Sequence, residues 1–90
     1  MRKRGKTDAN QIEIVSALRA AGAHVAITSN LGGGFPDLVC MYADRVLLME
    51  VKSKGGRLTE EEQVFYNEWS AGMVVVYSVE EALDAIGRLA

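Results

Sequence analysis

The 90 residues carry a formal net charge of −2, and 49% of them are hydrophobic, with one proline and one cysteine. This length and composition fit one small globular domain, exclude a disordered chain and a membrane-spanning helix, and give no indication of a signal peptide. Because the lone Cys40 cannot form an internal disulfide, we expect a protein of the reducing cytoplasm. Because no apolar segment is long enough to span a bilayer, we expect no membrane partner.

The basic residues are concentrated in two segments. Four of the ten lie in the first six positions, and a second group follows at residues 52–57. We predict a basic N-terminal arm, residues 1–7, before a single domain, residues 8–90. The arm is either a solvated tail that keeps the protein soluble or a flexible segment that binds phosphates.

Three predicted helices begin with a residue pair that resembles a capping box, in which two side chains three positions apart bond each other's backbone. The helical segments are 10–22, 60–72 and 79–90, and their pairs are Asp8–Gln11, Thr59–Glu62 and Ser78–Glu81. We expect Ile14 and Leu18 to face the core and Gly22 to end the first helix. In the second helix the expected apolar face consists of Phe65, Tyr66 and Trp69.

Four apolar or β-branched segments predict strands at residues 24–29, 37–42, 45–52 and 73–78. The last is the most continuously apolar, so we expect it to be a central strand covered on both faces. A strand–helix–strand step across residues 45–78 implies a right-handed crossover and a partly parallel sheet. The predicted fold class is therefore a compact α/β domain, with a mixed central sheet flanked by helices in the order α-β-β-β-α-β-α.

Three ionisable residues are expected to meet on one face of the second and third strands. If Ala43-Asp44 is a two-residue turn, Asp37 lies opposite Glu50, with Cβ atoms roughly 4.5–5.5 Å apart. Lys52 shares that face because side chains alternate along a strand. Ala-Asp is not a favoured hairpin turn, so this register is an assumption.

Two opposed carboxylates repel each other unless a cation lies between them, and a hard divalent ion such as Mg²⁺ binds oxygen ligands well. The alternative interpretation is an exposed Glu50–Lys52 ion pair on an edge strand, with Asp37 capping a turn. The apolar segment 46–51 favours the first interpretation, because unpaired charges in a buried strand are costly.

Pro36-Asp37 and Glu50-Val51-Lys52 match the PD-(D/E)XK signature of metal-dependent nucleases. The longer pattern over residues 8–86, with "GGGFPDLV", "LLMEVKS" and "LTEEEQ", resembles the virus-type replication–repair (VRR-NUC) branch in its stand-alone phage form. The resemblance implies a restriction-endonuclease-like core with a Mg²⁺ or Mn²⁺ site and no organic cofactor.

The resemblance also implies roles for individual residues. The implied metal ligands are Asp37, Glu50, the main-chain carbonyl of Val51 and, directly or through water, Glu13. Lys52 would position the attacking water or stabilise the phosphate, and Gln63 would border the site. Glu13 could instead be an exposed helix carboxylate, and Gln63 a polar residue of a first helical turn.

The function implied by the resemblance is a structure-selective DNA endonuclease, similar to Holliday-junction resolvases and acting as a homodimer. The alternatives are a flap or nicking nuclease, or a non-catalytic DNA-binding module that keeps the nuclease fold. The residues expected to contact DNA are Arg2, Lys3, Arg4, Lys6, Lys54 and Arg57.

Overall fold

The computed structural model describes residues 5–90, with their side chains from residue 9 onward. The elements are α1 (Gly5–Ala20), β1 (His24–Ile27), β2 (Leu38–Tyr42), β3 (Arg45–Val51), α2 (Glu60–Trp69), the 3₁₀ turn η1 (Ser70–Gly72), β4 (Met73–Val76) and α3 (Val79–Gly87). This order confirms the predicted α/β fold class. None of the described helices is long and apolar enough to cross a bilayer.

The four strands form one mixed sheet in the order β1-β2-β3-β4. β1 and β2 pair antiparallel, as do β2 and β3, whereas β3 and β4 pair parallel. The prediction that residues 73–78 form a central strand was wrong, because β4 pairs only with β3 and lies at an edge. Its apolar character reflects packing, since Met73 and Val76 are buried and Val76 contacts the same core as α3.

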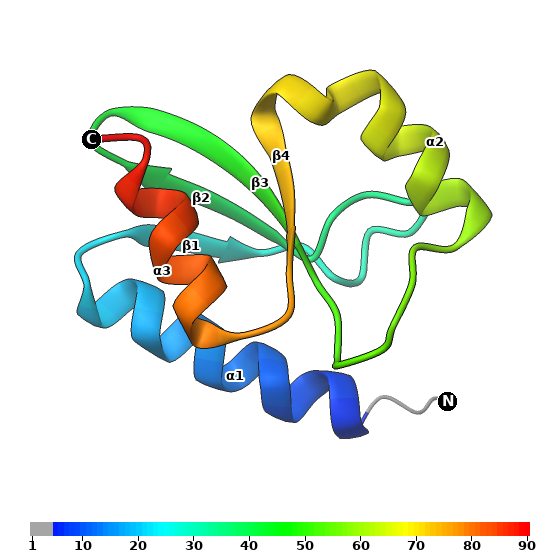
Figure 1. The fold of residues 1–90 in the computed structure, drawn as a ribbon, viewed down its shortest axis with the longest axis horizontal. Coiled ribbons are helices and arrows are strands. Elements are labelled where there is room, and N and C mark those ends of the chain that lie inside the picture. The colour runs from blue at the N-terminus through cyan, green and yellow to red at the C-terminus, as the bar shows by residue number, and fades with distance from the viewer. Residues whose placement is uncertain (1–4) are drawn as a thin grey trace.

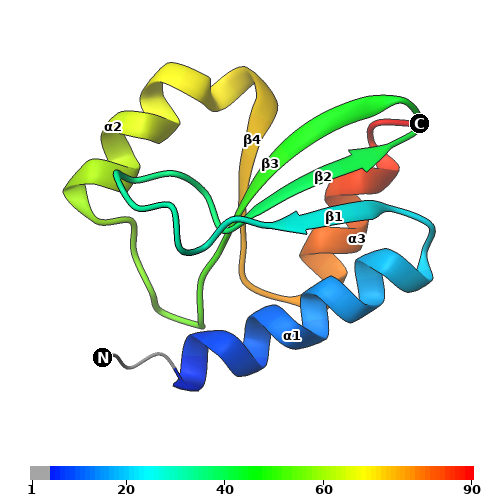
Figure 2. The same cartoon turned by 180° about the vertical axis from the view of Figure 1, so that it is seen from behind.

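The helices lie on different sides of the sheet. α1 and α3 pack side by side against one face, whereas α2 lies apart from them and leads through η1 into the start of β4 (Figure 1), and the view from behind shows the same arrangement (Figure 2). The core between the sheet and the α1–α3 layer includes Ile14, Leu18, Leu38, Cys40, Met49, Val51, Ala82 and Ile86. Residues that alternate with these on β2 and β3, including Glu50, therefore point away from α1 and α3.

α1 begins earlier than the sequence pattern predicts. It starts at Gly5, so Asp8 lies inside the helix and the predicted capping box at its start was wrong, since residues 5–7 already continue the helix. The predicted arm therefore overlaps α1, and residues 1–4 lie outside the described part of the chain. The end is as predicted: Gly22 has φ +100°, and the amides of Gly22 and Ala23 donate to carbonyls of the last turn at 3.0 Å, forming a Schellman motif.

The β2–β3 hairpin has the predicted register. Its pairs run from Tyr42 with Arg45 at the turn to Leu38 with Met49 at the other end, which brings residue 37 beside Glu50. The turn residues Ala43 and Asp44 have φ of 53° and 62°, as a type I′ turn requires. Two non-glycine residues therefore adopt a left-handed conformation to keep this register.

The predicted capping box of α2 is confirmed, since Thr59 and Glu62 exchange both hydrogen bonds. At α3 the Ser78 hydroxyl accepts from the amide of Glu81, while the Glu81 carboxylate accepts from the amide of Tyr77. None of the residues of α2 is buried, and 53% of Trp69 is exposed. The first turn of α2 makes polar contacts near the end of β3, through Thr59, Glu62 and Lys52.

Candidate active site

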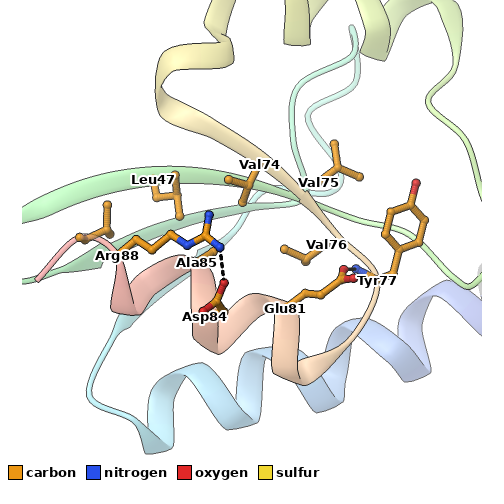
Figure 3. A pocket seen from close by; sticks show the side chains of 10 residues that line it. Leu47, Val74, Val75, Val76, Tyr77, Glu81, Asp84, Ala85 and Arg88 are labelled. Atoms are coloured by element: carbon orange, nitrogen blue, oxygen red, sulfur yellow. Dashed lines mark hydrogen bonds and ion pairs between the residues drawn. The ribbon is translucent and has the colours of Figure 1, made fainter.

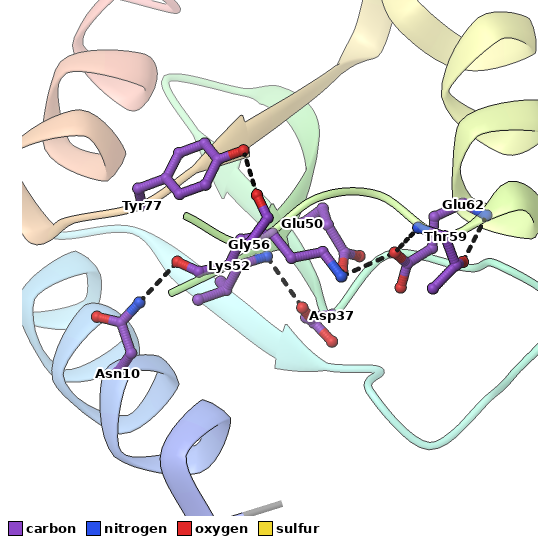
Figure 4. Close-up of polar contacts among 9 residues, drawn as sticks. Asn10, Asp37, Glu50, Lys52, Gly56, Thr59, Glu62 and Tyr77 are labelled. Carbon is purple, nitrogen blue, oxygen red and sulfur yellow. Dashed lines mark hydrogen bonds and ion pairs between the residues drawn. The ribbon is translucent and has the colours of Figure 1, made fainter. Parts of the chain in front are cut away.

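A pocket of about 350 Å³ lies where β3 ends and residues 52–59 lead to α2. Five ionisable residues line it, from the loop before β2, from β3, from residues 52–59 and from α2. Figure 4 shows four of them: Asp37, Glu50, Lys52 and Glu62. Its lining residues are Asp37, Glu50, Val51, Lys52, Ser53, Gly56, Arg57 and Glu62. The structure therefore brings together Asp37, Glu50 and Lys52, as the sequence predicts.

Asp37 is held at the edge of the pocket by backbone contacts to two strands. Its carboxylate oxygen Oδ2 accepts a hydrogen bond from the amide of Val51 at 2.9 Å. Its own carbonyl accepts from the amide of Thr28 at 2.7 Å, just beyond β1. Burial raises the pKa of Asp37, and the bond from Val51 and the nearby Lys52 offset this only in part. One oxygen thus orients the carboxylate while the group remains costly to ionise.

Glu50 is the most deeply buried ionisable group of the pocket, with only 2% of its surface exposed. Its oxygen Oε2 lies 3.4 Å from the ammonium of Lys52, whereas the buried Oε1 has no hydrogen-bond partner among the described residues. Burial, followed by the charge of Asp37, raises the pKa of Glu50 to about 8. A buried carboxylate with an unsatisfied oxygen beside a second carboxylate is chemically suited to a hard divalent cation.

Lys52 contributes an ammonium group between two carboxylates. Its Nζ donates to Oε1 of Glu62 at 2.8 Å and lies 3.4 Å from Glu50. Burial alone lowers the pKa of Lys52, but the bond to Glu62 and the charges of both glutamates outweigh burial and raise it. The backbone of Lys52 is fixed as well, because its carbonyl accepts from Asn10 Nδ2 at 3.0 Å. The ammonium is therefore charged and held over the pocket.

Glu62 is a site residue that the sequence interpretation missed. It occupies the place expected for Gln63, whose side chain is exposed and donates instead to Asn67 at 2.9 Å. The sequence pattern assigned Glu62 to the capping box of the helix, so no contact between its carboxylate and Lys52 was predicted. Both roles are fulfilled at once, since its Oε1 accepts from the amide of Thr59 at 2.9 Å as well as from Lys52.

The structure does not bring Glu13 into the pocket. Glu13 is exposed on α1, and it is absent from the pocket lining. Gln11, about 200° away around the helix, is buried instead and donates to Ser29 Oγ at 3.1 Å. The helical spacing of Ile14 and Leu18 extends back to Gln11, so helix phase was the sequence signal for its burial.

A cation in this pocket would have Asp37 and Glu50 as its side-chain ligands. No group of three or more His, Cys, Asp or Glu side chains among the described residues is arranged to hold a metal. Two carboxylates are nonetheless a usual protein contribution to Mg²⁺, which keeps several of its waters. The residues present therefore fit Mg²⁺ or Mn²⁺, and the Val51 carbonyl remains a predicted ligand.

Basic residues lie beside this pocket. Arg57 lines it, and with Lys54 it also lines an adjoining hollow of about 650 Å³. Tyr77 also lines that hollow, and its hydroxyl donates to the carbonyl of Gly56 at 3.0 Å. The other predicted DNA contacts lie outside what is described: residues 2–4 entirely, and Lys6 in its side chain.

A second cleft, between β4 and α3, has a volume of about 390 Å³ (Figure 3). Three valines of β4 form much of its wall, and its charged groups already have partners. Asp84 and Arg88 pair with each other at 2.7 Å, and Glu81 accepts from the Tyr77 amide at 2.7 Å. Unsatisfied charge is therefore a property of the first pocket and not of this cleft.

No protein-family model, no curated protein and no solved structure matches the chain.

Proposed function

We propose that this protein is a divalent-metal-dependent endodeoxyribonuclease that hydrolyses phosphodiester bonds in branched DNA, as Holliday-junction resolvases do. The observation that carries the proposal is the buried Glu50 carboxylate, whose Oε1 has no partner among the described residues. Beside it lie a second carboxylate, Asp37, and the charged Lys52. Two carboxylates and a lysine at the mouth of a pocket are suited to phosphoryl transfer assisted by a metal.

In this proposal Asp37 and Glu50, with the Val51 carbonyl, hold Mg²⁺ or Mn²⁺. The bound ion would polarise a phosphoryl oxygen and lower the pKa of a water ligand. Lys52 keeps its ammonium charged, so it can donate to the attacking water or to the phosphate oxygens as negative charge develops. Water attacks phosphorus and the P–O3′ bond breaks; the water gives up one proton and the leaving 3′-oxygen takes one up, which leaves a 5′-phosphate and a 3′-hydroxyl.

Arg57 and Lys54 are placed to contact phosphates next to the one that is cut. Both are exposed and line the hollow that adjoins the pocket. The acidic net charge is compatible with DNA binding if basic groups gather on one surface. Arg2, Lys3, Arg4 and Lys6 are proposed to extend this surface.

Paired incisions in a junction require two active sites, so we propose a homodimer that acts in the cytoplasm. Met41 and Val46 pair on the sheet face opposite α1 and α3, and 44% and 54% of their surfaces are exposed. Val64 and Trp69 add exposed apolar surface on α2. These residues offer a second copy an apolar contact. Sedimentation of the protein, with Val46→Lys as the interface variant, tests the oligomeric state.

The experiment that tests the function is a cleavage assay with a labelled four-way junction, a flap, a nicked duplex and a plain duplex. Each substrate is incubated with Mg²⁺, Mn²⁺ or EDTA. Paired symmetric incisions in the junction, abolished by EDTA and by Lys52→Ala, are the expected result. Cleavage of the flap or the nicked duplex alone would support the proposed active site but contradict the four-way junction as its substrate. Folded protein that binds DNA without cutting any substrate would instead be a binding module.

A further inference from the structure

Glu62 links the first turn of α2 to the lysine of the candidate site (Figure 4). One oxygen, Oε1, accepts from Lys52 Nζ at 2.8 Å and from the Thr59 amide at 2.9 Å. The ammonium is farther from Glu50 Oε2, at 3.4 Å. Glu62 is therefore the nearer of the two carboxylates that compete for Lys52.

This competition affects what Glu50 can bind. A lysine side chain is flexible, and without Glu62 the nearest carboxylate to the Lys52 ammonium would be Glu50. A close Glu50–Lys52 pair would neutralise the carboxylate that a cation needs. With Glu62 present, the ammonium stays beside Glu50 while Oε1 of Glu50 remains without a partner among the described residues.

The position of Glu62 is also set by contacts between α2 and the loop before β2. A Cβ atom added to Gly34 would lie 2.5 Å from the carbonyl oxygen of Glu61, so this loop packs directly against the first turn of the helix. The rings of Phe35 and Phe65 meet edge to face, with centroids 5.3 Å apart. The loop that carries Asp37 thus also fixes the helix that carries Glu62.

We propose that Glu62 is a positioning residue, which holds the Lys52 ammonium beside Glu50 and leaves the Glu50 carboxylate available to a divalent cation. The catalytic consequence rests on the proposed nuclease function. The effect on cation binding does not, since it can be measured in the protein without DNA.

Three variants separate positioning from helix capping. Glu62→Gln keeps an oxygen that can accept from the Thr59 amide but removes the charge that attracts Lys52. Thr59→Ala removes the hydroxyl that accepts from the Glu62 amide at 3.2 Å and leaves the Glu62–Lys52 contact in place. Glu61→Gln is the matched control, an exposed carboxylate on the same turn.

The measurements are Mn²⁺ affinity by calorimetry, kcat and KM on the cleaved DNA substrate, and Tm. We expect Glu62→Gln to weaken Mn²⁺ binding and to lower kcat, each by roughly 10–100-fold as for other residues that orient metal-site groups. KM should stay within about 2-fold, because Glu62 is placed to act on Lys52 and not on DNA. Thr59→Ala should lower Tm without these effects, and Glu61→Gln should resemble the unmodified protein.

Glu62→Gln with unchanged Mn²⁺ affinity would overturn the inference and leave Glu62 as a helix cap. Complete loss of Mn²⁺ binding, equal to that in Asp37→Asn, would overturn it in favour of direct ligation by Glu62. Weaker Mn²⁺ binding in a protein that cuts no DNA would support the positioning role while the nuclease proposal fails. An unmodified protein that binds no Mn²⁺ would overturn both.

Discussion

Asp37 Oδ2 lies 2.9 Å from the backbone nitrogen of Val51, so the residue that precedes β2 is bonded to the last residue of β3. The bond orients a carboxylate at the place where the β2–β3 ladder ends. Because an amide oxygen can accept the same bond, the structural and the chemical roles of Asp37 can be separated by mutation.

Asp37→Asn is expected to fold and to bind DNA, but to lose cleavage by at least about 100-fold, since a metal ligand and a negative charge are both removed. Its stability should be equal to or greater than that of the unmodified protein, because a repulsion with Glu50 disappears. Asp37→Leu, which leaves the Val51 amide without an acceptor, should cost about 1–3 kcal/mol. The measurements are DNA cleavage, DNA binding and urea unfolding of each variant. An Asp37→Asn protein that cuts DNA normally would contradict the role of Asp37 as a metal ligand.

The stability of the metal-free protein should fall as pH rises from about 4.5 to about 8. Burial, then the charge of Asp37, raises the pKa of Glu50 from 4.5 to about 8. Over this window folded Glu50 keeps a proton that the unfolded chain has lost, so each pH unit costs up to about 1.4 kcal/mol. Glu62 acts in the opposite sense, because its lowered pKa contributes stability that is lost as pH falls below its usual 4.5.

Urea unfolding in EDTA at four pH values measures this slope. Glu50→Gln should flatten it, because the group no longer titrates, while Glu61→Gln, an exposed neighbour of Glu62, should not. An equally steep slope in Glu50→Gln would show that another group is responsible.

Divalent metal should stabilise the protein, and its removal should reverse the effect. A cation that binds only the folded state contributes about 2.7 kcal/mol at 100 times its Kd. For a domain of this size that raises Tm by roughly 10–20 °C. The rise should be largest above pH 8, where Glu50 is ionised, and absent in Glu50→Gln. Thermal unfolding with Mg²⁺, Mn²⁺ and EDTA gives the result, and an equal shift in Glu50→Gln would place the cation elsewhere.

Gly34→Ala should displace the first turn of α2. The new Cβ would lie 2.5 Å from the Glu61 carbonyl oxygen, at a φ of +82°. Gly33→Ala is the control, because Gly33 also has positive φ, +65°, but nothing lies within 4 Å of its Cβ. The difference between the two should be about 1–3 kcal/mol, as for other overpacked positions.

Fluorescence of Trp69, the single tryptophan, reports the change, since its ring stacks on Phe65 at 5.4 Å. Only Gly34→Ala should also lower cleavage, because it moves Glu62 relative to Lys52. Equal losses in both variants would mean that backbone strain alone accounts for the effect.

Sequence patterns predicted most of this fold because local signals agreed with it. The capping box at Thr59–Glu62 and the alternation of β2 and β3 identified the elements, and the pairing of Asp37 with Glu50 followed from the assumed turn. The edge position of β4 could not be predicted from the sequence, because an edge strand that packs against α3 is as apolar as a central strand.

Around the pocket, the structure and the sequence interpretation differ for two separate physical reasons. Glu62 approaches Lys52 only because residues 52–59 turn back toward β3, and no periodicity encodes the path of that loop. Gln63 was favoured by resemblance, although it is Glu62 that faces the pocket. On α1, by contrast, the helical spacing of the buried residues predicts that Gln11 faces the core, because Gln11 continues the row of buried positions.

The turn at Ala43 and Asp44 offers a test of the hairpin that does not touch the pocket. Both residues hold positive φ, at 53° and 62°, where most side chains are strained and where Asn-Gly is favoured. Replacing the pair with Asn-Gly should stabilise the protein by about 1 kcal/mol, which raises Tm by roughly 4–8 °C. Cleavage should not change, because the register that places Asp37 beside Glu50 is kept. Replacement with Pro-Asp, whose proline cannot adopt positive φ, should lower both Tm and cleavage. If Asn-Gly failed to raise Tm, the turn would not be left-handed and the register at Asp37 would need another origin.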